Sequence, residues 1–383
     1  MKKVEYPKDI DSLKDRYIAS FDSKKLVDIE NAWTLFKSNN PEVAYITKNV
    51  KEIMLMDFKE LLGLYTEYIS KVSPAKRKEF GRKDEPTSLY KSVFDYDSWG
   101  SHIRSFFADP ANGFNIHTCH YCESAYINSY KVEGDDLILY RINSSPEKEI
   151  ENFLYLAHRG KAKAIFENAP YKTLDELKSF VDLTNFKKDF HDDTATRVMR
   201  QFDLDHVLDK ASCPLVALSL MNFVPCCSVC NSRLKHSAVQ GRMGLPDEKL
   251  SPTSNLYKFD EQVEIRLHSR TGCTYNNPLQ HQSDFYIEFE TDDPDYGYEI
   301  GLFKLKERYN YHIAEALRLL KLKQKYSDSA IQMISNSLPD RARYSAVKIK
   351  EDIFGVRFSK TEHRVFDKMK RDIMNQLDCS TKL

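Results

Sequence analysis

The residues best suited to chemistry begin with two Cys-x-x-Cys pairs, Cys119 with Cys122 and Cys227 with Cys230. Two such pairs can supply four thiolates to one tetrahedral zinc ion, and the spacing suits two ligands on one tight turn. Cys226 leaves a second pairing open, but only Cys227 completes Cys-x-x-Cys with Cys230. The stretch 201–235, QFDLDHVLDKASCPLVALSLMNFVPCCSVCNSRLK, adds further polar residues beside the second pair: Asp205, His206, Asn222 and Asn231. The sequence therefore predicts a structural zinc site with catalytic chemistry beside it.

At these residues the chain resembles the HNH, or ββα-metal, nuclease family. In that family a strand ends in Asp-His or His-His, a loop carries an Asn, and the next helix carries His or Asn. Here FDLDH matches the strand, MNFVPCCSVC the loop and NSRLKH the start of the helix. In zinc-bearing members two Cys-x-x-Cys pairs bracket this core, in the order found here. The resemblance covers roughly residues 115–240 and implies an α+β fold, with mainly helical flanking regions around a zinc-bound ββα-metal core.

Hydrolysis of a phosphodiester needs an activated water, a Lewis acid on the scissile phosphate and stabilisation of the leaving oxygen. The resemblance implies that His206 is the general base, because a neutral imidazole can accept a proton from water near neutral pH. A structural or metal-binding histidine is the alternative. Asp205 offers a carboxylate suited to a catalytic Mg²⁺ or Mn²⁺. Asp203 lies on the same strand face as Asp205 and is a rival ligand.

Two asparagines and a histidine complete the predicted site. Asn222 is expected to bond backbone groups near the general base, as the family's middle Asn does, and an ordinary turn residue is the alternative. Asn231 takes the position of the family's last metal ligand. His236 is a rival, but a residue five positions further along an α-helix shares a face with Asn231 poorly.

The helix after the second knuckle also carries positive charge. Arg233 and Lys235 are expected to reach phosphate oxygens of a nucleic acid. Ordinary surface charge is the alternative for both residues.

The flanking sequence predicts three regions. Residues 1–110 form a helical amino-terminal region, residues 111–240 hold the nuclease core with a helical insertion at about 146–190, and residues 241–383 form an α+β region that ends in helices. The compact family core does not need the insertion, which is therefore expected to position the core or bind a partner.

Local patterns give more detailed expectations. One helix is predicted over residues 50–72, and an exposed loop over 73–87. The segments SAYINSYKV and DDLILYRIN are predicted to be strands, as are YKFDEQVEIRLHS and FYIEFETDD nearer the carboxyl terminus.

Composition limits the class of protein. The chain has 383 residues, of which 41% are hydrophobic, enough for two or three globular domains. Lys+Arg and Asp+Glu each number 57, so the overall charge does not indicate a polyanionic partner. No apolar run reaches the ~18 residues of a membrane span, and MKKVEYPKDIDSL lacks the apolar core of a secretory signal. Paired cysteine spacing in such a chain favours metal and a reducing compartment, so we expect a cytoplasmic protein.

The combined expectation is a metal-dependent HNH endonuclease that hydrolyses phosphodiester bonds in nucleic acid, with the resemblance putting DNA ahead of RNA. The first knuckle, Cys119-His120-Tyr121-Cys122-Glu123, is similar to that of the HNH component of Septu-type bacterial antiphage systems. This similarity implies antiviral defence and a separate ATPase subunit, since the chain has no Walker A motif. The alternative is a zinc-ribbon nucleic-acid-binding or interaction subunit that docks an ATPase and has little intrinsic cleavage. The oligomeric state and the substrate's sequence are left open.

Overall fold

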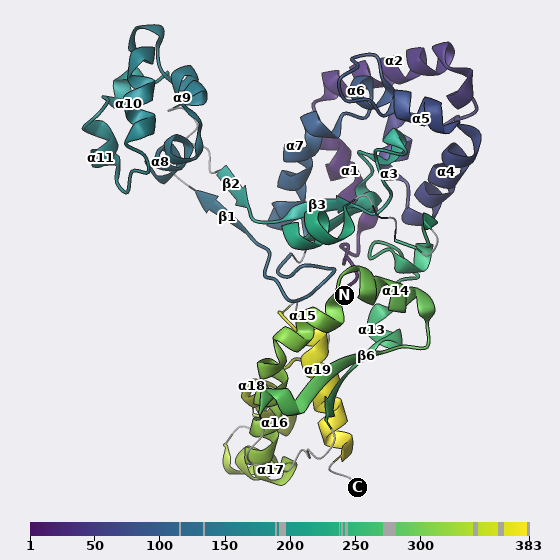
Figure 1. The fold of residues 1–383 in the computed structure, drawn as a ribbon, viewed down its shortest axis with the longest axis vertical. Helices are drawn as coiled ribbons and strands as arrows, with labels where there is room; N and C mark the ends of the chain where they lie inside the picture. The colour runs from purple at the N-terminus through teal and green to yellow at the C-terminus, as the bar shows by residue number, and fades with distance from the viewer. Residues whose placement is uncertain are drawn as a thin grey trace. The chain divides into compact units, whose positions relative to one another are not determined.

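The computed structural model describes residues 1–114, 116–132, 135–187, 190, 197–236, 238, 240–241, 244–270, 281–339, 344–358 and 364–380. Within these ranges the chain is mostly helical, with two-stranded antiparallel sheets that pair β1 with β2, β3 with β4 and β5 with β6 (Figure 1). This agrees with the predicted α+β class. The chain divides into two compact units, residues 129–201 and residues 1–128 together with 202–383. None of the helices described is both long and apolar enough to cross a membrane.

The first part of the larger unit is helical. Its elements are α1 (Ile10–Ala19), α2 (Ser23–Asn39), η1 (Pro41–Val43), α3 (Val50–Leu55), α4 (Phe58–Lys71), α5 (Pro74–Phe80), α6 (Leu89–Ser92), α7 (Tyr96–Ala108) and η2 (Pro110–Asn112).

Capping residues correct two of the sequence expectations here. The single helix predicted over 50–72 is two helices, because Asp57 forms a capping box with Glu60 and starts α4 anew. The prediction of an exposed loop over residues 73–87 is wrong for its first half, which contains α5. Ser73 caps α5 through the backbone N–H of Lys76, and Pro74 occupies the first helical turn.

The smaller unit is a helical insertion on a two-stranded ribbon. β1 (Ser129–Val132) pairs antiparallel with β2 (Arg197–Arg200), so the chain enters and leaves the insertion side by side. Between the strands lie α8 (Asp135–Ser144), α9 (Glu147–Phe153), η3 (Leu156–Lys161), α10 (Ala162–Glu167), α11 (Leu174–Lys178) and η4 (Leu183–Asn185). Their buried side chains form a separate core that includes Ile150, Leu154, Ile165, Leu177 and Phe186.

The segment DDLILYRIN is helix α8 and not the predicted strand. Ile142 follows Leu139 by three residues and Ile138 by four, so a helix can turn all three toward the core of the insertion.

The carboxyl-terminal part contains the strands β5 (Glu264–Ser269) and β6 (Phe285–Glu290). Only the second half of the predicted strand YKFDEQVEIRLHS is β5, because Phe259–Gln262 form a helix. Side chains close both edges of this sheet: Gln376 bonds the backbone N–H and C=O of Leu267, and Asn310 bonds those of Ile287. The other elements are η9 (Glu248–Leu250), α13 (Phe259–Gln262), η10 (Gln282–Asp284), α14 (Pro294–Leu302), α15 (Leu305–Tyr311), α16 (Ile313–Lys325), α17 (Asp328–Ser337), α18 (Ala346–Phe354) and α19 (Asp367–Ser380).

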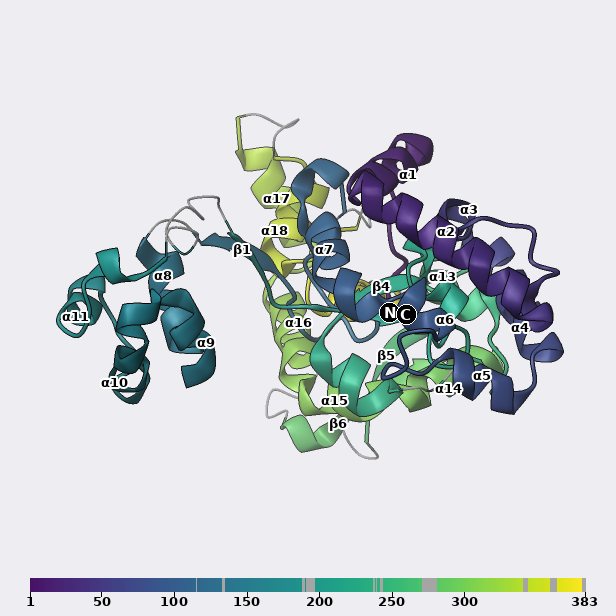
Figure 2. The same ribbon diagram turned by 90° about the horizontal axis from the view of Figure 1, so that it is seen from above.

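The stretch that carries the predicted chemistry folds as strand, strand, helix. β3 (Asp203–His206) pairs antiparallel with β4 (Phe223–Cys226), and the connection between them contains η5 (Pro214–Val216) and η6 (Leu220–Asn222). The helix that follows, η7 (Val229–Lys235), is a π-helix. Helix α7 lies against the two strands (Figure 2). The ring of Tyr96, its first residue, is 4.5 Å from that of His206 and 5.7 Å from that of Phe223.

Candidate functional site

The four cysteines of the two Cys-x-x-Cys pairs meet at one point. Their Sγ atoms all lie within 4.8 Å of one another. Zinc–sulfur bonds of ~2.3 Å in tetrahedral geometry separate the thiolates by about 3.8 Å, so this cluster could hold a metal ion such as zinc. Cys226 is not part of the cluster, since its Sγ lies 3.7 Å from the backbone oxygen of Asp203. Cys273 lies outside the described residues, as does the side chain of Cys379.

Arg308 on α15 touches the cluster. Its Nη1 donates to Cys230 Sγ at 3.2 Å and its Nη2 to Ser124 Oγ at 3.1 Å. Burial opposes the charged guanidinium, but the thiolates of Cys122 and Cys230 outweigh burial and raise the pKa of Arg308. Four thiolates around Zn²⁺ leave a net negative charge, which a cation at this distance offsets. Sequence reasoning missed Arg308 because it lies 78 residues from Cys230 and belongs to no motif.

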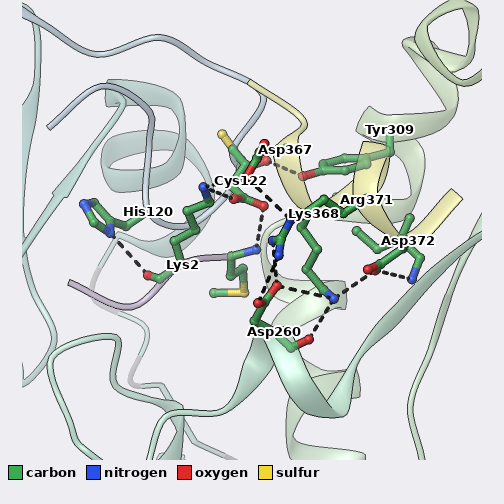
Figure 3. Close-up of polar contacts among 12 residues, drawn as sticks. Lys2, His120, Cys122, Asp260, Tyr309, Asp367, Lys368, Arg371 and Asp372 are labelled. Carbon is green, nitrogen blue, oxygen red and sulfur yellow. Dashed lines mark hydrogen bonds and ion pairs between the residues drawn. The ribbon is translucent and has the colours of Figure 1, made fainter. Parts of the chain in front are cut away.

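Figure 3 shows how the first knuckle is held against other parts of the larger unit. The hydroxyl of Tyr309 donates to the backbone oxygen of Cys122 at 2.9 Å. The fully buried carboxylate of Glu123 lies 3.4 Å from Lys2 Nζ, which also lies 3.4 Å from Asp367 on α19. The knuckle is therefore fixed by the amino-terminal segment, α15 and α19 together.

A cavity of about 190 Å³ lies next to the second knuckle. Its polar and charged lining comes from α7, β3, the loop after β3 and η7: Tyr96, Arg104, Asp203, Asp205, His206, Asp209, Lys210, Asn231, Lys235 and His236. The structure thus brings together four of the predicted site residues, Asp205, His206, Asn231 and Lys235. Asn222 and Arg233 do not line the cavity.

His206 is held in one tautomer. Its Nε2 lies 3.0 Å from the backbone oxygen of Ala217, and because a carbonyl can only accept, Nε2 carries the hydrogen. Nδ1 then has a lone pair, which accepts from Lys210 Nζ at 3.3 Å. Burial lowers the pKa of His206 well below its usual value, and the charge of Lys210 adds to this. The imidazole is therefore neutral, the form that a general base requires.

Asp205 precedes His206 at the end of β3, and both side chains line the cavity because the strand stops there. The carboxylate of Asp205 is buried and accepts a 2.6 Å hydrogen bond from the hydroxyl of Tyr121. Lys235 Nζ lies 3.1 Å from Oδ1 and 3.0 Å from Oδ2, and also donates to the backbone oxygen of His206 at 2.8 Å. Tyr121, between the cysteines of the first knuckle, thus connects the cysteine cluster to Asp205.

Lys235 does not lie where the sequence placed it. Contact with phosphate oxygens was predicted, with ordinary surface charge as the alternative, whereas the side chain is 3% exposed and paired with Asp205. Its ammonium therefore lies inside the cavity and not at the outer surface of η7. Arg233, two residues earlier on η7, is exposed.

Asn222 is fully buried and bonds only backbone groups among the described residues. Its Oδ1 accepts from the N–H of Leu208 at 2.7 Å, and its Nδ2 donates to the oxygens of Leu208 at 3.0 Å and Val216 at 2.9 Å. These bonds fix the loop that follows His206 and the segment that presents the oxygen of Ala217. Asn222 therefore acts on the position of His206 and not on the cavity directly.

The π-helix changes the comparison between Asn231 and His236. The backbone N–H of His236 bonds the oxygen of Asn231 at 2.9 Å, a bond between residues five apart. The sequence prediction that His236 shares a face poorly with Asn231 applies to an α-helix. In the π-helix this prediction is wrong, because both residues line the same cavity. Asn231 Nδ2 also donates to Asp203 Oδ2 at 3.2 Å, so the rival carboxylate belongs to the same group.

The cavity offers fewer closely spaced ligand atoms to a catalytic metal than the cysteine cluster offers to zinc. Among the described residues, only the cysteine cluster gathers three or more Cys, His, Asp or Glu ligand atoms closely. The carboxylates, amide and imidazoles around the cavity are of the type that suits Mg²⁺ or Mn²⁺. A cation at Asp205 would have to share this carboxylate with Lys235 or displace it.

Comparison of the chain with protein-family models, with curated proteins and with solved structures gave no match in any of the three. The resemblance to HNH nucleases therefore rests on the residues of the site alone.

Proposed function

We propose that this protein is a metal-dependent HNH-type endonuclease that hydrolyses phosphodiester bonds in nucleic acid. One observation carries the proposal: a neutral His206 with an unprotonated Nδ1 lies in the same cavity as Asp205 and Asn231, next to the four-cysteine cluster. A base, oxygen ligands and a fixed support are the groups that this hydrolysis requires.

His206 would accept the proton of the attacking water at Nδ1. The imidazolium that forms donates from Nε2 to the oxygen of Ala217, which stabilises the new charge. Asn222 keeps this oxygen in place through Val216 and Leu208. Asp205 and Asn231 would hold Mg²⁺ or Mn²⁺, which supplies Lewis-acid stabilisation of the phosphate and of the leaving oxygen.

The cysteine cluster would hold a structural zinc. Four thiolates around zinc leave no position for substrate, and such sites contribute directly to folding free energy. Because Tyr121 lies between two of the ligands and bonds Asp205, zinc also fixes the catalytic carboxylate. Loss of zinc is therefore expected to remove cleavage as well as stability.

The wider setting rests on the family resemblance. It puts DNA ahead of RNA, and antiphage defence with a separate ATPase subunit ahead of other roles. The protein is proposed to act in the cytoplasm.

A zinc-ribbon nucleic-acid-binding or interaction subunit is the second candidate. The ion pair between Lys235 and Asp205 favours it, because the ammonium already neutralises the carboxylate that a catalytic cation needs.

The two candidates differ in their response to added metal. Purified protein would be incubated with plasmid DNA and with single-stranded DNA and RNA, across a series of Mg²⁺ and Mn²⁺ concentrations, while its zinc content is measured. The nuclease proposal expects cleavage that depends on added metal and is greatly reduced in Asp205→Asn. Zinc-loaded protein that binds nucleic acid but cuts none of these substrates would support the second candidate instead.

A further inference from the structure

Lys210 is one of the charged residues of the cavity, with Arg104, Asp203 and Asp209, that the proposed chemistry does not yet use, and it is the one in contact with the proposed base. It follows His206 by four residues, in the loop after β3. Its Nζ lies 3.3 Å from His206 Nδ1 and 4.8 Å from the centre of the Tyr96 ring. The side chain is partly buried and lines the cavity.

No carboxylate among the described residues forms an ion pair with Lys210. The adjacent Asp209 accepts instead from the N–H of Ala211 at 3.0 Å and from the N–H and hydroxyl of Ser212 at 3.0 and 2.6 Å. The other lysine of the cavity, Lys235, pairs with Asp205. Burial lowers the pKa of Lys210, the charge of Lys83 adds to this, and the more distant carboxylates of Asp205, Asp97 and Asp209 oppose it. Lys210 Nζ is therefore partly buried against a neutral acceptor, His206 Nδ1, with no carboxylate of the described residues in ion-pair contact, so an anion in the cavity would be a stronger partner for it.

The contact with His206 has a consequence for the proposed base. While Lys210 donates to Nδ1, the lone pair of that nitrogen cannot accept a proton from water. A phosphate oxygen carries negative charge and is a better acceptor for an ammonium than a neutral imidazole. A lysine side chain is also flexible enough to change partner without movement of the backbone.

We propose that Lys210 binds the scissile phosphate, and that its transfer from His206 Nδ1 to the phosphate exposes the general base only when substrate is present. The inference rests on the proposed nuclease function and adds to it a phosphate ligand and a substrate-dependent release of the base. With substrate bound, water approaches the exposed Nδ1 while the ammonium neutralises the phosphate.

The kinetic test compares Lys210→Met with Lys210→Arg. Loss of one charge-assisted hydrogen bond should lower kcat/KM for DNA cleavage about 10- to 100-fold in Lys210→Met, and Lys210→Arg should recover most of it. Lys71→Met is a matched control, since Lys71 also lies over a tyrosine ring, that of Tyr45 at 4.0 Å, but is outside the cavity. Zinc content and the melting temperature check the fold, and Lys210→Gln replaces Lys210→Met if the latter does not fold.

The second test does not require cleavage. The ¹⁵N resonance of His206 Nδ1, assigned with His206→Gln in ¹⁵N-histidine-labelled protein, would be followed as inorganic phosphate is added without divalent metal. In wild type the ¹⁵N chemical shift of Nδ1 should move toward that of an imidazole nitrogen that accepts no hydrogen bond. In Lys210→Met the chemical shift should already lie near this value without phosphate and should not change when phosphate is added.

The outcomes separate this inference from the nuclease proposal. The role of Lys210 would be overturned if Lys210→Met had the kcat and KM of wild type. It would also be overturned if phosphate left the His206 resonance of wild type unchanged. In both cases cleavage by wild type would still support the nuclease proposal. Absence of cleavage by wild type would overturn the nuclease proposal, and the resonance would still decide whether Lys210 moves to phosphate.

Discussion

Arg308 allows a direct test of how the metal cluster is supported. Replacing it with Met keeps most of the side chain's volume and removes the donor 3.2 Å from Cys230 Sγ. Outer-shell partners of metal ligands are typically worth about 10- to 100-fold in metal affinity, or about 1.4 to 2.7 kcal/mol. A hydrogen bond to a charged group contributes about 1.5 to 3 kcal/mol, so two independent arguments give the same range. Arg308→Lys keeps the charge but cannot bond Cys230 and Ser124 together, so an intermediate loss is expected.

The assay is competition for zinc between the protein and a chromogenic chelator, read as the zinc dissociation constant. Lys306→Met serves as the control, because Lys306 lies on the same helix but pairs with Glu288 at the surface. We expect the zinc dissociation constant to be lowest in wild type, higher in Arg308→Lys and highest in Arg308→Met. Equal zinc affinity in all three proteins would refute the electrostatic role given to Arg308.

Three further predictions concern the site and its surroundings. Asn222→Ala should lower the free energy of unfolding by about 3 kcal/mol, since three buried backbone groups lose their partner; an unchanged midpoint in urea denaturation would contradict this. Cys230→Ser should lose the zinc and Cys226→Ser should keep it, and metal analysis showing equal zinc in both variants would exclude the assigned ligand set. Burial raises the pKa of Glu299 to about 8, above its value of 4.5 in the unfolded chain, so the folded protein retains a proton that the unfolded chain releases. The stabilisation of the folded state by this proton is fully present below about pH 4.5 and is lost as pH rises toward 8. Glu299→Gln should therefore reduce the pH dependence of the melting temperature.

The sequence predicted the parts of the site that depend on short motifs. Spacing alone selected the four cysteines that converge, and the alternation in β5 and β6 located both strands. FDLDH contains the predicted strand and residues 231–235 of NSRLKH lie in the predicted helix, whereas MNFVPCCSVC, expected as a loop, contains the strand β4. These features are local, because a few neighbouring residues determine each of them.

Features that depend on distant contacts were missed. Tyr121 and Arg308 reach the site from 84 and 78 residues away; Arg308 belongs to no motif, and the first knuckle marks Tyr121 without indicating its bond to Asp205. The sequence predicted phosphate contact or surface charge for Lys235 and not its burial, which depends on the π-helix and on the carboxylate of Asp205, 30 residues away. The helix α8 was taken for a strand because its apolar run suits both structures, and only the core of the insertion decides between them.

The central claim is that His206 acts as a general base in phosphodiester hydrolysis. The most direct measurement is the single-turnover rate of DNA cleavage by His206→Ala, at saturating Mg²⁺ or Mn²⁺, compared with wild type and with His158→Ala in the insertion as the control. If His206 is the base, His206→Ala should cleave about 10²- to 10⁴-fold more slowly than wild type, added metal should not restore the rate, and DNA affinity and zinc content should be unchanged. A wild-type cleavage rate in His206→Ala would contradict the central claim.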